Sequence, residues 1–205
     1  MSRVLPVLFN TEMVRATLDG RKDATRRIVK GFIPNDAVWG YTAFTPKGYI
    51  SCRGTFADGY GEKFFKLPCE PGNILYVRET WKKAPNGYYY YEDWQKNDIA
   101  DITKWKPSIR MPKEAARIWL KVTDVKVERL QNITEDGSKA EGAIDNRGFI
   151  HSPDNEYDRI HTAREHFIEI WNSTIKKSSL DRYGWDASPW VWVIEFERCE
   201  KPEVN

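Results

Sequence analysis

The sequence has few cysteines, and no regular spacing relates them. Its 205 residues include only Cys52, Cys69 and Cys199, and no CxxC pair occurs. An odd, irregularly spaced set is poor support for a disulfide framework. We therefore expect a protein of a reducing compartment, the cytoplasm.

Histidine is equally scarce, and the sequence has no HExxH motif. His151, His161 and His166 are the only histidines. The last two are five residues apart, which is poor spacing for two metal ligands on one helix face. We expect all three to be surface or packing residues, and we expect no metal site and no cofactor.

Long hydrophobic runs are also missing. No stretch approaches the roughly 18 apolar residues that cross a membrane. The N-terminal segment "MSRVLPVLFN" has too short an apolar run for a signal peptide. We expect a soluble chain without a membrane partner.

The overall charge excludes a general argument for nucleic-acid binding, because the net charge is only +2. The charge is uneven, however. Residues 15–30 hold six basic and two acidic side chains, a local charge of +4. Such a cluster either binds phosphate and steers an anionic ligand, or forms a solvated turn.

Aromatic residues are abundant, at 14% of the chain with nine Trp and ten Tyr. This content excludes a disordered chain. Aromatics in this number either fill a core or line a recognition surface.

Periodicity and turn signals predict several strands and three or four short helices, without a regular βαβ rhythm. A strand is predicted over residues 4–9, and a helix follows it, capped by Asn10 or Thr11 and ended by Gly20. Residues 31–70 are expected to form loops or a small hairpin. The fold class predicted is α+β, a small mixed β-barrel with peripheral helices in one domain of residues 1–205.

Later segments carry clearer signals. The segment 117–130 predicts a long strand with a bulge near Thr123-Asp124, because its apolar residues change phase there. Thr134 is predicted to cap a short helix, and residues 153–175 a longer one. Alternation makes "WVWVIEFER" a closing strand. Asn86-Gly87 predicts a hairpin turn.

The segment "ILYVRETW" predicts one strand after the Pro71-Gly72-Asn73 turn. Alternation then places Leu75, Val77, Glu79 and Trp81 on one face. A carboxylate on the same face as apolar side chains is either at the solvent-exposed end of the strand or partly buried with a partner. Burial would raise the pKa of Glu79, and a nearby lysine would lower it.

Three residues form a candidate catalytic set: Lys22, Thr25 and Glu79. A threonine hydroxyl becomes a nucleophile when a base removes its proton, and a lysine whose pKa is lowered is such a base. A carboxylate can orient the lysine or carry a proton to a leaving amine. Spacing alone favours the simpler interpretation, a Lys–Glu ion pair beside a turn threonine.

The arginines of "GRKDATRR" are candidate substrate-binding residues. Arg21, Arg26 and Arg27 supply positive charge beside Lys22. In a strand, Arg26 and Arg27 would face opposite ways, one into a cleft and the other into solvent. An inward arginine suits a phosphate or carboxylate.

Trp81 and Trp105 are the aromatic candidates for substrate binding. Trp105 lies between two lysines in "KWKP", and the four tyrosines 88–91 and Trp94 are near "WKKAP". Aromatic residues interleaved with basic ones suit stacking on unpaired bases. The alternative is a hairpin whose alternate tyrosines pack on the barrel.

The stretch "GRKDATRR" resembles the G-x-K-x-x-x-x-R signature of the ASCH family, a group of PUA-like domains, with Gly20, Lys22 and Arg27 in its fixed places. "PGNILYVRETW" and "WVWVIEFER" resemble the turn-plus-strand and last strand of that family. Asn73 is a departure, since the family usually has an acidic residue there. With "KWKPSIRMP", "VTDVKVERLQNIT" and "AEGA", the chain is similar to ASCH-like proteins of bacteriophages and prophages. Residues 31–70 and 84–104 are then insertions.

The resemblance implies a PUA-like β-barrel with a cleft near the signature and an association with RNA. Some small bacterial ASCH proteins are amidohydrolases of N4-acetylcytidine, and their lysine, threonine and glutamate would correspond to Lys22, Thr25 and Glu79. Others are described as ribonucleases or RNA binders. This chain is about twice the length of the minimal amidohydrolases, so its substrate can differ.

The leading hypothesis is therefore a domain that binds RNA or a modified nucleoside or nucleotide, and that hydrolyses an amide if the trio is catalytic. The alternatives are a non-catalytic RNA-binding module and a phage accessory or assembly protein that acts through protein contacts. The sequence does not determine the oligomeric state.

Overall fold

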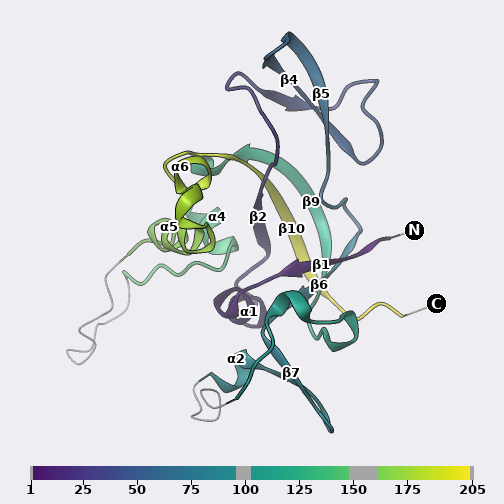
Figure 1. Cartoon of the computed structure of the whole chain (residues 1–205), viewed down its shortest axis with the longest axis vertical. Coiled ribbons are helices and arrows are strands. Elements are labelled where there is room, and N and C mark those ends of the chain that lie inside the picture. The colour runs from purple at the N-terminus through teal and green to yellow at the C-terminus, as the bar shows by residue number, and fades with distance from the viewer. Residues whose placement is uncertain (1, 96–102, 148–160, 204–205) are drawn as a thin grey trace.

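The computed structural model describes residues 2–95, 103–147 and 161–203. They form a mixed α+β fold, as predicted, with a curved central sheet and two smaller sheets at opposite ends of the molecule (Figure 1). The described helices are α1 (Thr11–Leu18), α2 (Tyr91–Trp94), α4 (Glu135–Ala140), α5 (Ala163–Thr174) and α6 (Leu180–Tyr183).

The central sheet has five strands in the order β1-β6-β9-β10-β2. β1 and β6 are parallel, and the other neighbours are antiparallel. The bounds are β1 Val4–Leu8, β6 Ile74–Arg78, β9 Trp119–Arg129, β10 Trp190–Cys199 and β2 Ala24–Ile28.

The sheet does not close into the predicted barrel, since β1 and β2 remain its two edges within the described chain. The edges nevertheless approach each other. The Arg27 guanidinium of β2 donates to the Leu8 carbonyl oxygen of β1 at 3.0 Å. One side chain, rather than a ladder of backbone hydrogen bonds, spans the opening.

The predicted bulge in the long strand is confirmed. Asp124 pairs with Glu195 and Val122 with Phe196, so Thr123 is the extra residue on β9. A bulge bends its strand and increases the local twist. The bend lets both apolar stretches of β9 contribute to the same curved sheet.

The closing strand supplies both faces of the core, as its alternation predicts. Trp192, Ile194 and Phe196 lie in the cluster beneath the central sheet. Val191 and Val193 lie in a second cluster with Phe167 and Trp171 of α5. β10 is therefore buried on both sides, and α5 is held against one of them.

Two helix starts also follow the sequence. The Asn10 side chain accepts from the Met13 N–H and caps α1, and Gly20 has the positive φ of 72° expected after the helix. Thr134 caps α4 by accepting from Gly137 N–H.

Helix α5 begins later than predicted. Its first residue is Ala163, because Thr162 and Glu165 form a reciprocal capping box. Ala163, Phe167, Ile170 and Trp171 pack against the second cluster, as their helical spacing predicts. Residues 153–160, which the prediction also assigned to this helix, lie outside the described residues.

Residues 31–70 were expected to be loops or a small hairpin, and they form more than that. A separate sheet has the order β3-β4-β5, with bounds Val38–Gly40, Tyr49–Phe56 and Gly59–Lys66. Its inner side chains Ile50, Cys52 and Phe56 are buried, whereas Phe44 and Tyr60 are 84% and 74% exposed.

The predicted strand 74–81 is interrupted. β6 ends at Arg78, and β7 (Trp81–Ala84) pairs with β8 (Gly87–Tyr90) in a separate hairpin. Its turn is Pro85-Asn86, one residue earlier than the expected Asn86-Gly87 turn, because Gly87 already pairs with Ala84. Leu75 and Val77 lie in the main core, but Trp81 lies in a third cluster with Met111 and Trp119. The single face predicted for Leu75, Val77, Glu79 and Trp81 is therefore wrong.

None of the described helices is both long and apolar enough to span a membrane.

Candidate functional site

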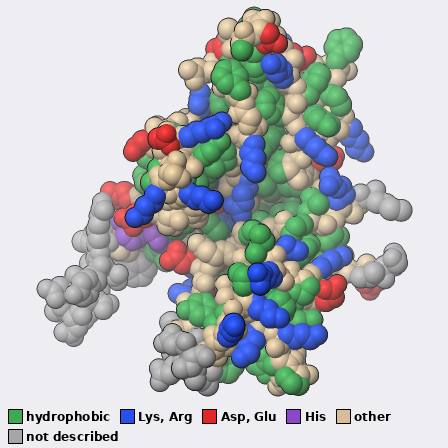
Figure 2. All heavy atoms as spheres, viewed as in Figure 1, with side chains coloured by type: hydrophobic (Ala, Val, Ile, Leu, Met, Phe, Trp, Pro, Cys, Tyr) green, Lys and Arg blue, Asp and Glu red, His purple; other side chains and the backbone are tan. Residues whose placement is uncertain are grey.

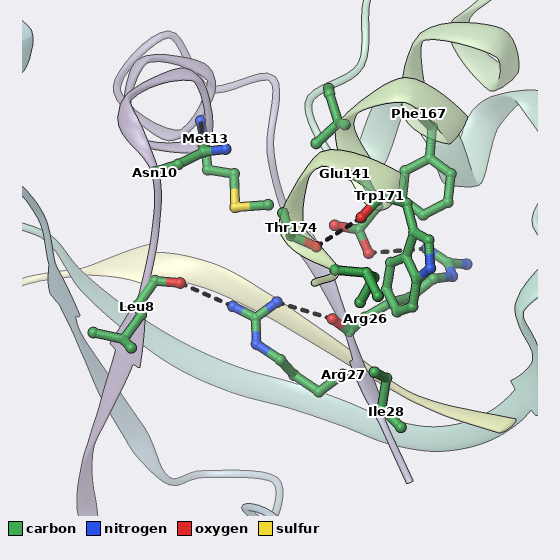
Figure 3. Close-up of a pocket in the computed structure, with 12 residues that line it drawn as sticks. Leu8, Asn10, Met13, Arg26, Arg27, Ile28, Glu141, Phe167, Trp171 and Thr174 are labelled. Atoms are coloured by element: carbon green, nitrogen blue, oxygen red, sulfur yellow. Dashed lines mark hydrogen bonds and ion pairs between the residues drawn. The ribbon is translucent and has the colours of Figure 1, made fainter. Parts of the chain in front are cut away.

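A pocket of about 350 Å³ lies between the loop after β1, the strand β2 and helix α5 (Figure 3). Its apolar walls include Met13, Phe167 and Trp171. Its polar lining residues are Asn10, Arg26, Arg27, Glu141 and Thr174. The pocket therefore adjoins the signature segment where the sequence placed the candidate site.

Lys22 does not itself line the pocket, but it bonds to Glu141, which does, and the Lys22 side chain is completely buried. The backbone reverses at Gly20 after α1, and Lys22 then pairs with Glu141 in an isolated bridge. The Lys22 Nζ donates to the Ala24 carbonyl, the Glu141 carbonyl and Glu141 Oε2, each at 2.8 Å. All three ammonium protons thus have acceptors.

Burial lowers the pKa of Lys22 below its ordinary value, because desolvation penalises the charged amine. The positive charges of Arg27 and Arg26 lower it further. Glu141 opposes both effects. The amine is therefore easier to deprotonate than a surface lysine, even with Glu141 beside it.

Glu141 is the centre of a buried ion-pair chain. Its second oxygen, Oε1, accepts from Arg26 Nη1 at 3.3 Å, and the Arg26 Nη2 donates to Glu128 Oε1 at 2.7 Å. Glu141 is not among the site residues predicted from the sequence. The segment "AEGA" contributed only to the resemblance, and no short-range spacing relates residues 119 positions apart.

The side chain of Arg27 has different hydrogen-bond partners from that of Arg26. Arg26 is buried between two carboxylates, whereas the half-buried Arg27 donates to the Thr25 hydroxyl and to the carbonyls of Arg26 and Leu8. In the described chain no carboxylate lies within ion-pair distance of Arg27. Both arginines line the pocket, so the expected division between cleft and solvent does not hold.

Thr25 is fully buried in β2. Its Oγ1 accepts from Arg27 Nη1 at 2.7 Å, and the residue does not itself line the pocket. A nucleophilic role would require Arg27 to move away from this hydroxyl.

The structure gives Glu79 different neighbours from those expected. Its two oxygens accept from Arg117 Nε and Nη2 at 2.9 Å, and Arg117 Nη1 also donates to Asp93. Among the described residues, no hydrogen bond or ion pair joins Glu79 to Lys22 or Thr25. The ring of Phe9 lies 5.2 Å from Lys22 Nζ, while the Phe9 N–H donates to the carbonyl of Arg78.

Burial raises the pKa of Glu79, although Arg117 opposes this effect; Asp93 and Glu92 add to it. The folded carboxyl therefore holds its proton more tightly than the unfolded one, whose ordinary pKa is 4.5. The contribution of the Glu79 carboxyl to the free energy of unfolding is present at low pH and is lost as the pH rises through the raised pKa.

We expect this titration to appear in a comparison of wild type with Glu79→Gln. The free energy of unfolding of wild type relative to the variant should fall as the pH rises above 4.5, by up to about 1.4 kcal/mol per pH unit over the raised interval. Urea unfolding between about pH 4 and pH 8 measures this difference. A difference that rises with pH would contradict the buried-carboxyl interpretation.

The remaining predicted binding residues are dispersed. The exposed Arg21 pairs with Asp19 and donates to the Gly142 carbonyl. Trp81 is buried, so its ring is not available for stacking, which corrects that prediction. Trp105 is half-buried beside the β7–β8 hairpin, in a different pocket.

Residues 2–95, 103–147 and 161–203 contain no group of three His, Cys, Asp or Glu side chains arranged to hold a metal ion. The rings of His161 and His166 pack together at 4.8 Å. His166 Nδ1 accepts a hydrogen bond from the Ile144 N–H, so this ring nitrogen already has a partner within the protein.

Comparisons of the chain with protein-family models, curated proteins and solved structures give no match.

Proposed function

We propose that this chain is an ASCH-type, PUA-like domain that binds RNA or a modified nucleoside or nucleotide in the pocket between β2 and α5. One observation carries the proposal. The Arg27 guanidinium lines a largely apolar pocket, and its described acceptors are all uncharged. An anionic group entering the pocket would supply the missing negative charge.

The walls of the pocket favour a ligand with an aromatic part. Phe167 and Trp171 belong to α5, and the Arg26 guanidinium lies beside these rings, while Arg27 lines the same pocket (Figure 3). A nucleotide combines a flat base for these rings with a phosphate for Arg27. Its chemistry fits both kinds of lining residue.

Replacing Arg27 by glutamine should weaken binding of cytidine 5′-monophosphate by about 10- to 100-fold, because hydrogen bonds to charged groups contribute about 1.5–3 kcal/mol. Calorimetric titration measures the affinity. Arg27→Lys should restore only part of it, because an ammonium lacks the bidentate fork.

Arg21→Gln is the matched control. Arg21 is exposed, already pairs with Asp19, and does not line this pocket. Its loss should leave the affinity within about two-fold. An Arg27→Gln variant that binds the nucleotide as tightly as wild type would remove the proposed anion site.

A second candidate function, hydrolysis of an amide on a modified base such as N4-acetylcytidine, is favoured by the environment of Lys22. Its lowered pKa suits a general base, and Thr25 lies three residues further along the chain. Arg27 connects the Thr25 hydroxyl to the pocket. Ligand binding that draws Arg27 away would free this hydroxyl.

Glu141, rather than Glu79, would then be the carboxylate that acts with the lysine, because it is the one bonded to Lys22 Nζ. In that role Lys22, as the neutral amine, would accept the Thr25 proton while Thr25 Oγ1 attacks the amide carbonyl. The amide C–N bond would then break as Lys22 returns the proton to the leaving amine, and water would hydrolyse the resulting ester on Thr25 to release the carboxylic acid.

A further inference from the structure

We propose that a second pocket, on the β7–β8 hairpin, stacks an unpaired base of single-stranded RNA. This inference rests on the proposed RNA-binding function and gives that function a second contact point. The pocket has a volume of about 250 Å³ and is lined by Lys82, Ala84, Tyr89, Trp94, Thr103 and Trp105. It shares no lining residue with the pocket at Arg27.

Three half-buried aromatic rings from different segments meet at this pocket. Tyr89 comes from β8, Trp94 from the end of α2, and Trp105 from the segment after it. Tyr89 and Trp94 are 6.1 Å apart with an interplanar angle of 59°. The two rings contact each other in a tilted arrangement, so neither ring covers the whole face of the other as a stacked ring would.

The hairpin is a firm support for these rings. Tyr88 and Tyr90 pack against the third core cluster, and the Tyr90 hydroxyl donates to the Ala115 carbonyl at 2.7 Å. Trp81, at the base of β7, is buried in the same cluster. The alternate tyrosines thus pack inward, as one of the sequence interpretations expected, and Tyr89 lines the pocket.

The charge around the pocket selects the ligand class. None of the four lysines of this region forms an ion pair with a described residue: Lys82, Lys83, Lys104 and Lys106. The nearby acids are already paired, Glu92 with Arg15 and Asp93 with Arg117. Figure 2 shows basic side chains grouped at this end of the molecule, over the hairpin that Figure 1 labels β7.

An aromatic pocket alone would also suit a quaternary ammonium group. These lysines, which form no ion pair with a described residue, disfavour such a cation and favour a polyanion. Single-stranded RNA provides phosphates for the lysines and bases for the rings, which is the combination that stacking sites use.

The test is the binding of a fluorescein-labelled RNA decamer, followed by fluorescence anisotropy. Trp94→Ala should weaken binding by about five- to 150-fold, the range for loss of one stacked base, whereas Trp94→Phe should keep most of the affinity. Tyr60→Ala is the control, because Tyr60 is an exposed aromatic residue on β5 of the other small sheet. Circular dichroism establishes that each variant is folded.

A decamer of the same length with abasic sites separates stacking from phosphate binding. It should bind wild type and Trp94→Ala equally, because it has no base to stack. A Trp94→Ala variant that loses the same factor on both decamers would overturn the proposal. A single-stranded DNA decamer that shows the same loss as RNA would support stacking and extend the site to single-stranded nucleic acid.

Salt dependence tests the lysines. Lys82→Gln should reduce the slope of log affinity against log salt by about one. Lys47→Gln should not, because Lys47 lies in the loop between β3 and β4, outside this pocket. Equal slopes for Lys82→Gln and wild type would contradict phosphate contact at this pocket.

The same RNA titrated with Arg27→Gln distinguishes the two proposals. Loss with Arg27→Gln but not with Trp94→Ala would overturn the hairpin site alone. Loss with Trp94→Ala but not with Arg27→Gln would support the hairpin site and overturn RNA binding at the first pocket. No RNA binding by folded wild type would overturn the hairpin site and RNA binding at the first pocket, while the titration with cytidine 5′-monophosphate would still test nucleotide binding there.

Discussion

Glu141→Ala is expected to lower the free energy of unfolding by about 3–5 kcal/mol, the usual effect of removing one partner of a buried ion pair. The Lys22 side chain is fully buried, and its ammonium would lose its only carboxylate partner among the described residues. Arg26 would lose the same partner but keep Glu128. Urea unfolding measures the change.

Two variants make this test specific. Glu128→Ala should cost less than half as much, because the Glu128 side chain is 22% exposed and Arg26 would keep Glu141. The double variant Lys22→Met/Glu141→Leu should recover much of the loss, since an apolar pair leaves no charge unpaired. A single-variant loss below about 1 kcal/mol would show that water reaches Lys22.

Lys22→Met is expected to lower kcat for N4-acetylcytidine hydrolysis by about 10²- to 10⁴-fold, the usual contribution of a general base. Amide hydrolysis would depend on this residue because Lys22 is the only buried lysine in the described chain, and it lies three residues before Thr25. Met replaces the lysine with an unbranched apolar side chain that is one atom shorter and lacks the amine, and Glu141 keeps Arg26 as a partner. Chromatography of cytidine and acetylated cytidine measures turnover.

The two carboxylates give the decisive comparison. Glu79→Gln should change kcat by no more than a few-fold, because Glu79 is bonded to Arg117 and not to Lys22. Glu141→Gln should reduce kcat strongly, because it alters the group that holds the lysine. The reverse pattern would return the catalytic role to Glu79. No turnover by folded wild type would remove amide hydrolysis and leave ligand binding.

Local chemistry made several elements predictable. Asn10 and Thr134 cap helices because their side chains accept hydrogen bonds from N–H groups two or three residues later. The alternation around Trp192 predicted which residues of β10 face each cluster, because the period of a strand is two. The bulge at Thr123 was visible as a change of phase in the same pattern.

Patterns that depend on distant neighbours were not predictable in this way. The sheet in residues 31–70 contains β5, whose sequence "GYGEKFFK" has two glycines and little alternation. It is a strand because β4 pairs along its whole length. Likewise, β6 ends at Arg78, and Trp81 turns into a separate hairpin that packs on Met111 and Trp119.

The sequence by itself determined the caps, the bulge, the two-faced closing strand and a basic segment after a helix-ending glycine. Only the tertiary structure decided what that segment contacts. Lys22 bonds to Glu141, and Glu79 bonds to Arg117. Arg27 lines a largely apolar pocket, and among the described residues no carboxylate lies within ion-pair distance of it. The physical reason is the sequence range of the interactions. Helix caps and hydrophobic periodicity depend on residues a few positions apart, whereas the partner of a buried charge is set by the packing of the whole chain.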